Sequence, residues 1–277
     1  MSAALGLDHV GIAVPDLDAA SAEWEALGFR LTALARHGSA RPGGGIAPTG
    51  TGNRCIMFRQ GYLELIAVID PARRSPTLEA MLARHAGAHV VTLAVADEEA
   101  ALARLTRAGF ATDLARSARP ADPLEPEGPQ ARFARLPLSE AAPRLQLLRQ
   151  LTPELVWQER FLHHPNHAAA LEEIVIAADP PASLAARLSR AAGLPVWPDP
   201  AGGFALLLPQ GRVRVLPPEA LGAVLPGVAI PDLPFVAGVV LRTDDGAAAL
   251  RQIHAPARPA PGGWLAMASG TAVLFRD

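Results

Sequence analysis

One structural pattern recurs along the chain and limits the folds that it can adopt. A strand-like stretch leads to an Asp, a helical pattern follows, and a Gly stands twelve residues after the Asp. Asp16 with Gly28 and Asp97 with Gly109 share this spacing. Asp caps a helix by accepting an orphan backbone N–H, and Gly suits the left-handed residue that closes a helix. The chain therefore repeats a strand–helix unit.

The repeat extends into the second half of the chain. A third copy runs from Asp179 to Gly193, and a trimmed fourth copy begins at Thr243-Asp244. One strand, one helix and two or three strands make a βαβββ module, whose open sheet cannot bury its inner face alone. We therefore expect an α+β fold of four modules in two pairs, each pair leaving a cleft. The strand-like stretches that close the four modules are 54–58 and 62–68, 131–136 and 144–148, 204–208 and 212–216, and 264–267 and 272–275.

The length and composition place the chain in a broad class. Its 277 residues suffice for two domains. We expect an N-terminal paired domain at 1–150 that carries the site, a connector at 151–169, and a degenerate C-terminal pair at 170–277. The net charge of −2 is spread evenly along the chain, which argues against nucleic acid as a partner. All 25 basic residues are Arg, so Schiff-base chemistry and a Walker lysine are excluded.

Cysteine content and hydropathy indicate the expected location. Cys55 is the only cysteine, so no internal disulfide can form, as is usual in a reducing cytoplasm. No apolar run reaches the roughly 18–20 residues that a membrane span needs. We expect a cytoplasmic protein without a membrane partner, either a monomer or a homodimer.

Two polar side chains interrupt the apolar strands of the first module. His9 lies in a stretch where Val10, Ile12 and Val14 form one apolar face, and Glu64 lies in a similar stretch at 62–68. Because side chains alternate along a strand, each of these two residues lies on the face that the strand's principal apolar residues leave free. A carboxylate buried there without a partner costs several kcal/mol. A cation, a cross-strand hydrogen bond or water could remove this cost.

Several motifs together resemble the vicinal oxygen chelate superfamily, the fold of glyoxalase I, extradiol dioxygenases and fosfomycin-resistance proteins. The similarity is greatest to bacterial glyoxalase-like proteins. It implies cup-shaped mixed sheets with helices outside, and it covers residues 5 to about 180. The motifs are Leu7-Asp8-His9-Val10, Val14-Pro15-Asp16-Leu17, Gly50-Thr51-Gly52-Asn53-Arg54, Gly61-Tyr62-Leu63-Glu64-Leu65, Thr152-Pro153-Glu154-Leu155-Val156-Trp157 and His164-Pro165-Asn166.

The resemblance implies a divalent metal whose ligands come from the first and last strands of two paired modules. His9 and Glu64 match these positions in the first module, and such ligands suit Fe, Mn, Ni or Zn. Glu64 is also the candidate catalytic proton shuttle. In the second module Gln146 takes the place of Glu64, and Val90 aligns with His9. His89 lies one residue away, and only a β-bulge would turn it towards the site.

The remaining candidates are substrate-binding residues. An Arg at a cleft edge can bind a carboxylate or an enolate oxygen with two hydrogen bonds. A surface ion pair is the alternative for Arg54, packing is the alternative for Trp157, and His37 is either a lid residue or without a role. The candidates are Asn53, Arg54, Tyr62, Trp157, His164 and Asn166.

Two functions from different classes fit these patterns. The first is a metal-dependent enzyme of the lyase, isomerase or dioxygenase type that acts on a small vicinally oxygenated molecule. The second is a metal-free protein that binds and sequesters a small ligand, as resistance proteins do. His9 and Glu64 favour the enzyme, whereas Gln146 and Val90 favour the binding protein.

Overall fold

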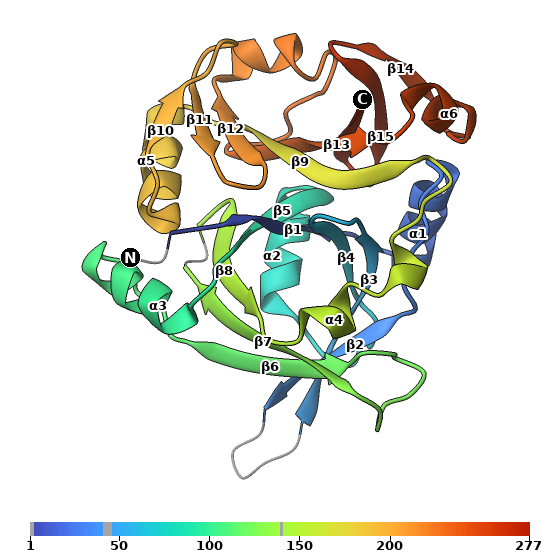
Figure 1. Cartoon of the computed structure of the whole chain (residues 1–277), viewed down its shortest axis with the longest axis vertical. Coiled ribbons are helices and arrows are strands. Elements are labelled where there is room, and N and C mark those ends of the chain that lie inside the picture. The colour runs from blue at the N-terminus through green and yellow to red at the C-terminus, as the bar shows by residue number, and fades with distance from the viewer. Residues whose placement is uncertain (1–2, 41–45, 139–140) are drawn as a thin grey trace.

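The strands form two eight-stranded mixed sheets, each built from two βαβββ modules (Figure 1). The computed structural model describes residues 3–40, 46–138 and 141–277. The strand order is β2-β3-β4-β1-β5-β8-β7-β6 in the first sheet and β10-β11-β12-β9-β13-β16-β15-β14 in the second. The predicted fold of four paired modules is confirmed.

The first sheet and its helices precede residue 151. A short helix that the sequence patterns did not predict, α2, links the two modules; it begins at Pro76, a residue well suited to the first turn of a helix. The elements are β1 Gly6–Ala13, α1 Leu17–Ala26, β2 Ala35–Ala40, β3 Ile46–Met57, β4 Tyr62–Val68, α2 Pro76–Arg84, β5 Gly87–Ala94, α3 Glu98–Arg107, β6 Ala115–Pro120, β7 Gln130–Pro137 and β8 Arg144–Gln150.

The connector and the second sheet follow. Two short helices form the connector, α4 Pro153–Val156 and the 3-10 helix η1 Glu159–Phe161. The remaining elements are β9 Ala168–Ala177, α5 Pro181–Ala192, β10 Val196–Pro198, β11 Phe204–Leu207, β12 Arg212–Leu216, the 3-10 helix η2 Pro218–Ala223, β13 Phe235–Thr243, α6 Gly246–Arg251, β14 Ala257–Ala260, β15 Gly263–Ala268 and β16 Thr271–Arg276.

The helix caps explain the sequence repeat in two modules and correct it in the others. Asp16 accepts hydrogen bonds from the first turn of α1, and Asp97 does the same for α3. In the third module the cap is Pro180 instead of Asp179, and in the fourth it is Asp245 instead of Asp244. The repeat therefore located all four helices but not all four capping residues.

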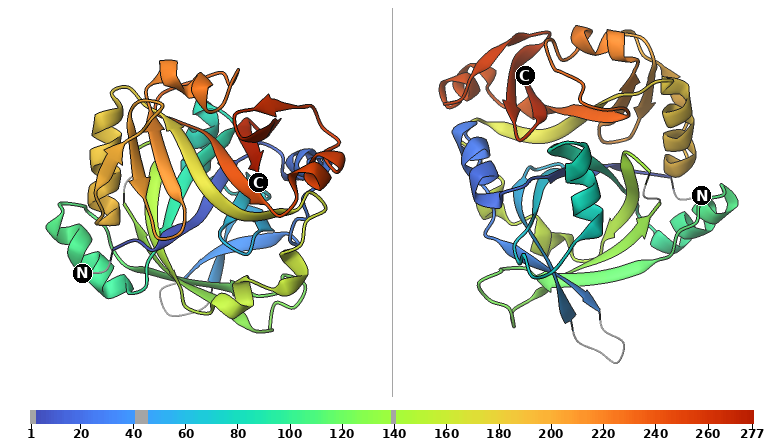
Figure 2. Two further views of the ribbon diagram at one scale, coloured as in Figure 1. Left: turned by 45° about the horizontal axis from the view of Figure 1, so that its top comes forward. Right: turned by 180° about the vertical axis from the view of Figure 1, so that it is seen from behind.

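The two sheets share one large core. Their outer faces and helices α1, α3 and α5 contribute to a single cluster of buried residues that includes Trp24, Val10 and Ile174. Figure 2 shows the second sheet arching over the first, with α1 and α5 flanking the junction. This core contains the apolar side chains of the outer face of each sheet, and the side chains of the concave faces lie outside it.

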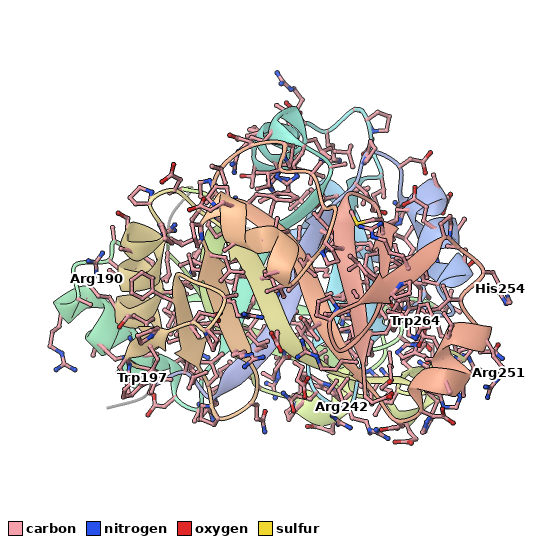
Figure 3. The ribbon with its side chains drawn as sticks, turned by 90° about the horizontal axis from the view of Figure 1, so that it is seen from above. Arg190, Trp197, Arg242, Arg251, His254 and Trp264 are labelled. Carbon is pink, nitrogen blue, oxygen red and sulfur yellow. The ribbon has the colours of Figure 1, made fainter. Side chains whose placement is uncertain are left out.

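The concave faces of the two sheets differ. The first sheet curls until β2 approaches β6, so it is almost a closed barrel (Figure 1). We call the space enclosed by its concave face the cup. Its interior holds polar side chains beside a small apolar cluster around Tyr62 and Phe133. The concave face of the second sheet is packed with apolar residues from its own strands and from η2. Figure 3 looks down on this sheet, with Trp197 near one edge and His254 near the other.

Candidate functional site

The site begins with an irregularity in β1. The pairing of β1 with β5 shifts by one residue between Leu7 and His9, as in a β-bulge. Asp8 and His9 would otherwise point to opposite faces, but here the Asp8 carboxylate lies 2.6 Å from Nδ1 of His9. Both residues are almost fully buried, at 2% and 3% exposure. The bulge thus creates a buried Asp–His pair.

The hydrogen bond to Asp8 fixes the state of the His9 ring. A carboxylate only accepts hydrogen bonds, so Nδ1 carries the proton and Nε2 presents its lone pair to the interior of the cup. The Tyr62 ring stacks on the imidazole with the centroids 4.5 Å apart. Three polar atoms surround Nε2: Thr92 Oγ1 at 2.9 Å, Gln146 Nε2 at 3.3 Å and Glu64 Oε2 at 3.7 Å.

Glu64 is an ionised carboxylate inside the cup. Its Oε1 accepts a hydrogen bond from the Asn53 amide and lies 3.7 Å from Nε2 of His37 on β2. Burial raises the pKa of Glu64, but the hydrogen bonds of the carboxylate with His37 and Asn53 and the nearby imidazoles of His9 and His37 outweigh burial and lower the pKa to about 2. Oε2 accepts no hydrogen bond from any described residue. One carboxylate oxygen therefore remains available to a ligand.

The second module contributes neutral groups. Thr92 is paired with His9 across β5 and β1, and Gln146 donates a hydrogen bond to the Thr92 hydroxyl at 2.8 Å. Gln150, four residues further along β8, donates to both carboxylate oxygens of Asp8 at 3.1 and 3.2 Å. A hydroxyl and two amides therefore stand where the second module was expected to supply further ligands.

The cluster can be tested for its fit to a divalent metal. No three His, Cys, Asp or Glu side chains form a metal-binding group in the described part of the chain. A third donor would be the Gln146 amide, whose oxygen faces Nε2 after an amide flip that leaves the Thr92 hydroxyl donating to it. Metal–ligand bonds of about 2.0–2.2 Å separate neighbouring ligand atoms by about 3–3.5 Å. The separations of 3.3 and 3.7 Å around His9 Nε2 are close to this range.

Two further features favour the metal. A ligating His commonly donates its second N–H to a carboxylate, as His9 does to Asp8. The Asn53 amide oxygen is buried beside Glu64 without a hydrogen-bond partner among the described residues. The donor set of one imidazole, one carboxylate and one amide therefore fits a divalent cation, although it is weaker than a set with two carboxylates.

The structure does not bring His89 into the cluster. Its Nε2 hydrogen-bonds the carbonyl of His85 at 2.9 Å, and the two imidazoles stack with centroids 4.0 Å apart near Phe235. Burial lowers the pKa of His89 to about 4, so the ring is neutral at pH 7. A second register shift between β1 and β5 does occur at His89, but it leaves the His89 ring against His85, whereas the shift at Asp8 places Thr92 beside His9. We correct the expectation that His89 is a ligand.

The substrate-binding candidates on β3 and β4 divide by strand parity. Asn53 faces the cup with Glu64, and Tyr62 lies against His9. Arg54 is on the opposite face of β3, where its guanidinium lies 3.5 Å from the Thr32 carbonyl and 3.7 Å from Asp18. Arg54 is therefore not part of the cup, and the alternative of a surface ion pair describes its position.

Trp157, His164 and Asn166 fix the connector. The Trp157 indole donates to the Phe58 carbonyl, and its ring meets the edge of Tyr62 with the centroids 6.0 Å apart. His164 bridges the backbone N–H of Arg30 and the carbonyl of Met57. Asn166 binds the Leu27 carbonyl and the N–H of Ala168. Trp157 thus borders the cup, whereas His164 and Asn166 hold the backbone outside it, contrary to the expectation for both.

Sequence patterns missed four residues of the cup. Strand alternation does not predict that Asp8 and Thr92 lie beside His9, because the bulge changes the register and no residue type in the sequence indicates a bulge there. Gln150 shares the parity of Gln146, which was a usable signal. Arg119 on β6 faces the interior of the cup through its pairing with Ala131, but the sequence around β6 has no apolar alternation to reveal this.

The second sheet carries ion pairs at the equivalent positions. Arg214 occupies the place of Glu64 and forms two hydrogen bonds with Asp199 at 2.6 and 2.7 Å. Glu173 occupies the place of His9 and is bound by Arg212 and Arg276. Guanidinium groups already compensate these carboxylates, so the second sheet does not repeat the metal-binding pattern.

Comparison with known proteins identifies the family of this chain. The model of a family described as a glyoxalase-like domain matches residues 7–192, which include the first sheet except Gly6 and the beginning of the second sheet. The chain belongs to this family. A comparison with curated proteins finds no match. Among the described residues of this glyoxalase-like protein, no helix is long and apolar enough to cross a membrane.

Solved structures share the fold at low identity. A hypothetical protein from Staphylococcus aureus matches with a TM-score of 0.70 and 9% identity, over 98% of this chain and 99% of the other. The Mn(II)-bound glyoxalase from Novosphingobium aromaticivorans matches with 0.55 and 13%, over 99% and 82%. A mutant 4-hydroxymandelate synthase from Streptomyces coelicolor matches with 0.56 and 12%, over 99% and 92%. The glyoxalase-like protein thus has the vicinal oxygen chelate fold.

Proposed function

We propose that this glyoxalase-like protein is a divalent-metal-dependent enzyme that acts on a small vicinally oxygenated molecule, with lyase, isomerase or dioxygenase chemistry. The observation that carries the proposal is the approach of His9 Nε2 to Glu64 Oε2 at 3.7 Å. Asp8 holds the His9 proton on Nδ1, so a nitrogen lone pair faces an ionised carboxylate. Two electron-pair donors in this arrangement favour a cation between them.

Each side chain of the cup has a role in this proposal. His9, Glu64 and Gln146 would hold the metal. When bound, the metal would act as a Lewis acid on the vicinal oxygens of the substrate. Asp8 keeps the His9 lone pair directed into the cup. The known Mn(II)-bound glyoxalase supports a divalent metal by analogy of fold alone.

Glu64 and Tyr62 would handle protons. Glu64 is ionised, and its Oε1 could accept a proton from a bound substrate while Oε2 faces the metal site. Its low pKa makes it a weak base until a substrate displaces Asn53 or His37 from the carboxylate. Burial raises the pKa of Tyr62 well above its usual value, so its hydroxyl stays a hydrogen-bond donor throughout the neutral range.

Metal content tests this proposal directly. Elemental analysis of untagged protein should find near-stoichiometric metal in the wild type and much less in His9→Ala, Glu64→Ala and Gln146→Ala. His163→Ala is the control, because this exposed His is paired with the exposed Glu159. Retained metal justifies assays with diketones, hemithioacetals and catechols. Absence of metal after reconstitution with Fe, Mn, Ni and Zn would overturn the proposal.

A metal-free binding protein is the second candidate. Thr92 and Gln146 favour it, because the Thr92 hydroxyl can satisfy the His9 lone pair without a metal. This candidate gains support when metal-free wild type binds small oxygenated ligands as tightly as metal-loaded protein does.

A further inference from the structure

Arg119 is an unpaired cation that faces the interior of the cup. It lies on β6 opposite Ala131, a fully buried residue of the apolar cluster inside the first sheet. Its guanidinium carbon is 5.7 Å from the centroid of the Phe133 ring. Among the described residues, no carboxylate forms an ion pair with Arg119 and no group hydrogen-bonds to its guanidinium. The guanidinium therefore has the cation–π contact with Phe133 in place of an ion pair or a hydrogen bond to a described residue.

A nearby arginine on the same strand does form ion pairs. Arg116, three residues earlier on β6, is paired with Glu98 at 3.1 Å and Glu99 at 3.6 Å. A half-buried guanidinium loses part of its hydration, and a cation–π contact of about 0.5–1 kcal/mol compensates little of that loss. Arg119 is therefore ready to bind an anion that the protein itself does not provide.

Arg119 lies on the same side of the cup as the residues that stack on His9. Its charge opposes the rise in the pKa of Tyr62 and of Cys55, which shows that it is electrostatically close to both. Phe133 pairs with Gln150, which donates to Asp8. These contacts connect the guanidinium, across β7 and β8, to the His9 cluster.

A hollow lies beside Pro120, the residue that follows Arg119 on β6. It has a volume of about 170 Å³ and lies where β2 approaches β6, the two edges of the curled sheet (Figure 1). Apolar side chains dominate its wall, and Arg36 adds a second positive charge. The residues around the hollow are Leu34, Ala35, Arg36, Pro120, Pro123 and Pro126.

We propose that the ligand of the cup is a small organic acid, whose carboxylate binds Arg119 while its neighbouring oxygens face His9 and Glu64. A planar guanidinium binds a carboxylate through two parallel, charge-assisted hydrogen bonds. Tyr62 and Phe133 would contact the apolar or aromatic part of the acid. This inference rests on the proposed function for the location of the vicinal oxygens, but the carboxylate contact itself needs no metal.

Two probes of similar size separate the carboxylate from the vicinal oxygens. Mandelate carries both, whereas 1-phenyl-1,2-ethanediol keeps two vicinal oxygens and lacks the carboxylate. Calorimetric titration should show that the wild type binds mandelate more tightly than it binds the diol. Arg119→Gln should weaken mandelate binding about 10- to 100-fold and leave the diol unchanged. Arg119→Lys should restore part of the loss.

Control measurements separate this inference from the proposed function. Arg132→Gln removes an exposed charge from the neighbouring strand β7 and should leave both probes unaffected. Metal content is measured on every variant, and Arg119→Gln should keep the wild-type value. Loss of metal from the wild type would overturn the proposed function alone. Three results would each overturn the assignment of Arg119. The wild type could bind the two probes equally well, or the wild type and Arg119→Gln could bind mandelate equally well. The third result is that neither mandelate nor the smaller acetate binds at all.

Discussion

The carboxylate of Asp8 lies 2.6 Å from Nδ1 of His9, although the two residues are neighbours on one strand. Alternation along a strand normally separates neighbouring side chains to opposite faces of a sheet. The register shift between β1 and β5 removes that separation. One backbone irregularity therefore decides which nitrogen of His9 faces the cup, and hence what the imidazole can bind.

Replacing Asp8 tests this relationship. Asp8→Asn should lower the affinity for a divalent metal about 10- to 100-fold, because a neutral amide supports the ring tautomer and its basicity less well. Chelator competition with Zn or Mn measures the affinity. Asp70→Asn is the control, since this partly exposed carboxylate binds Arg73 far from the cup. Equal affinities for wild type and Asp8→Asn would show that the pair does not serve a metal ligand.

Two buried histidines predict a loss of stability in mild acid. Burial lowers the pKa of His89 and of His164 to about 4, whereas an unfolded His titrates near 6.5. Between these values the unfolded state binds more protons, so the free energy of unfolding falls as the pH decreases from about 6.5 to 4. At pH 5 each of the two histidines should lower the free energy of unfolding by about 2 kcal/mol relative to pH 7.5.

Urea denaturation at pH 7.5, 6 and 5 measures this effect. His89→Gln should be less stable than the wild type at pH 7.5, because it loses the contact with His85, but its stability should depend less on pH. His163→Gln is the control, because His163 is exposed and should retain the wild-type pH dependence. A His89→Gln variant with unchanged pH dependence would contradict the prediction.

The ion pairs of the second sheet predict a stability effect without a metal effect. Burial raises the pKa of Glu173, but hydrogen bonds from Arg212 and Arg276 outweigh burial and lower it. Glu173→Gln removes the buried negative charge and should reduce the free energy of unfolding by about 2–3 kcal/mol. Glu172→Gln, one residue away and more exposed, should change it little. Metal content should stay constant in both, and a loss of metal in Glu173→Gln would contradict the prediction.

Much of the fold was predictable because its signals are local. Asp16 and Asp97 cap helices through contacts within one turn, and Gly28 and Gly109 adopt the left-handed conformation that ends them. The pairing of modules followed from the need to cover an open sheet. α2 was missed because it has only one buried residue, Leu78, and so lacks an apolar stripe.

The site was less predictable because it depends on long-range register. His9 and Glu64 came from strand parity and Gln146 from the family resemblance, and the three meet in the structure. Thr92 reaches His9 only through the bulge, and His37 reaches Glu64 only because the sheet curls. His164 and Asn166 were assigned to the cup by resemblance, whereas their hydrogen bonds all go to the backbone of the connector and its neighbours.

The sharpest prediction concerns the third metal ligand. Gln146→Glu keeps the size of the side chain and adds a negative charge 3.3 Å from His9 Nε2. Without metal, the new carboxylate repels Glu64 and should lower the free energy of unfolding. With metal, it replaces a neutral donor by an anionic one, so the affinity should rise about tenfold or more.

The matched control for Gln146→Glu is Gln150→Glu. It adds the same charge to the same strand, but it faces Asp8 instead of Nε2, so it should destabilise the protein without a gain in metal affinity. Chelator competition and urea denaturation, each with and without Zn or Mn, measure both effects. A Gln146→Glu variant that is destabilised with or without metal would contradict the assignment of Gln146 as a metal ligand in this family member.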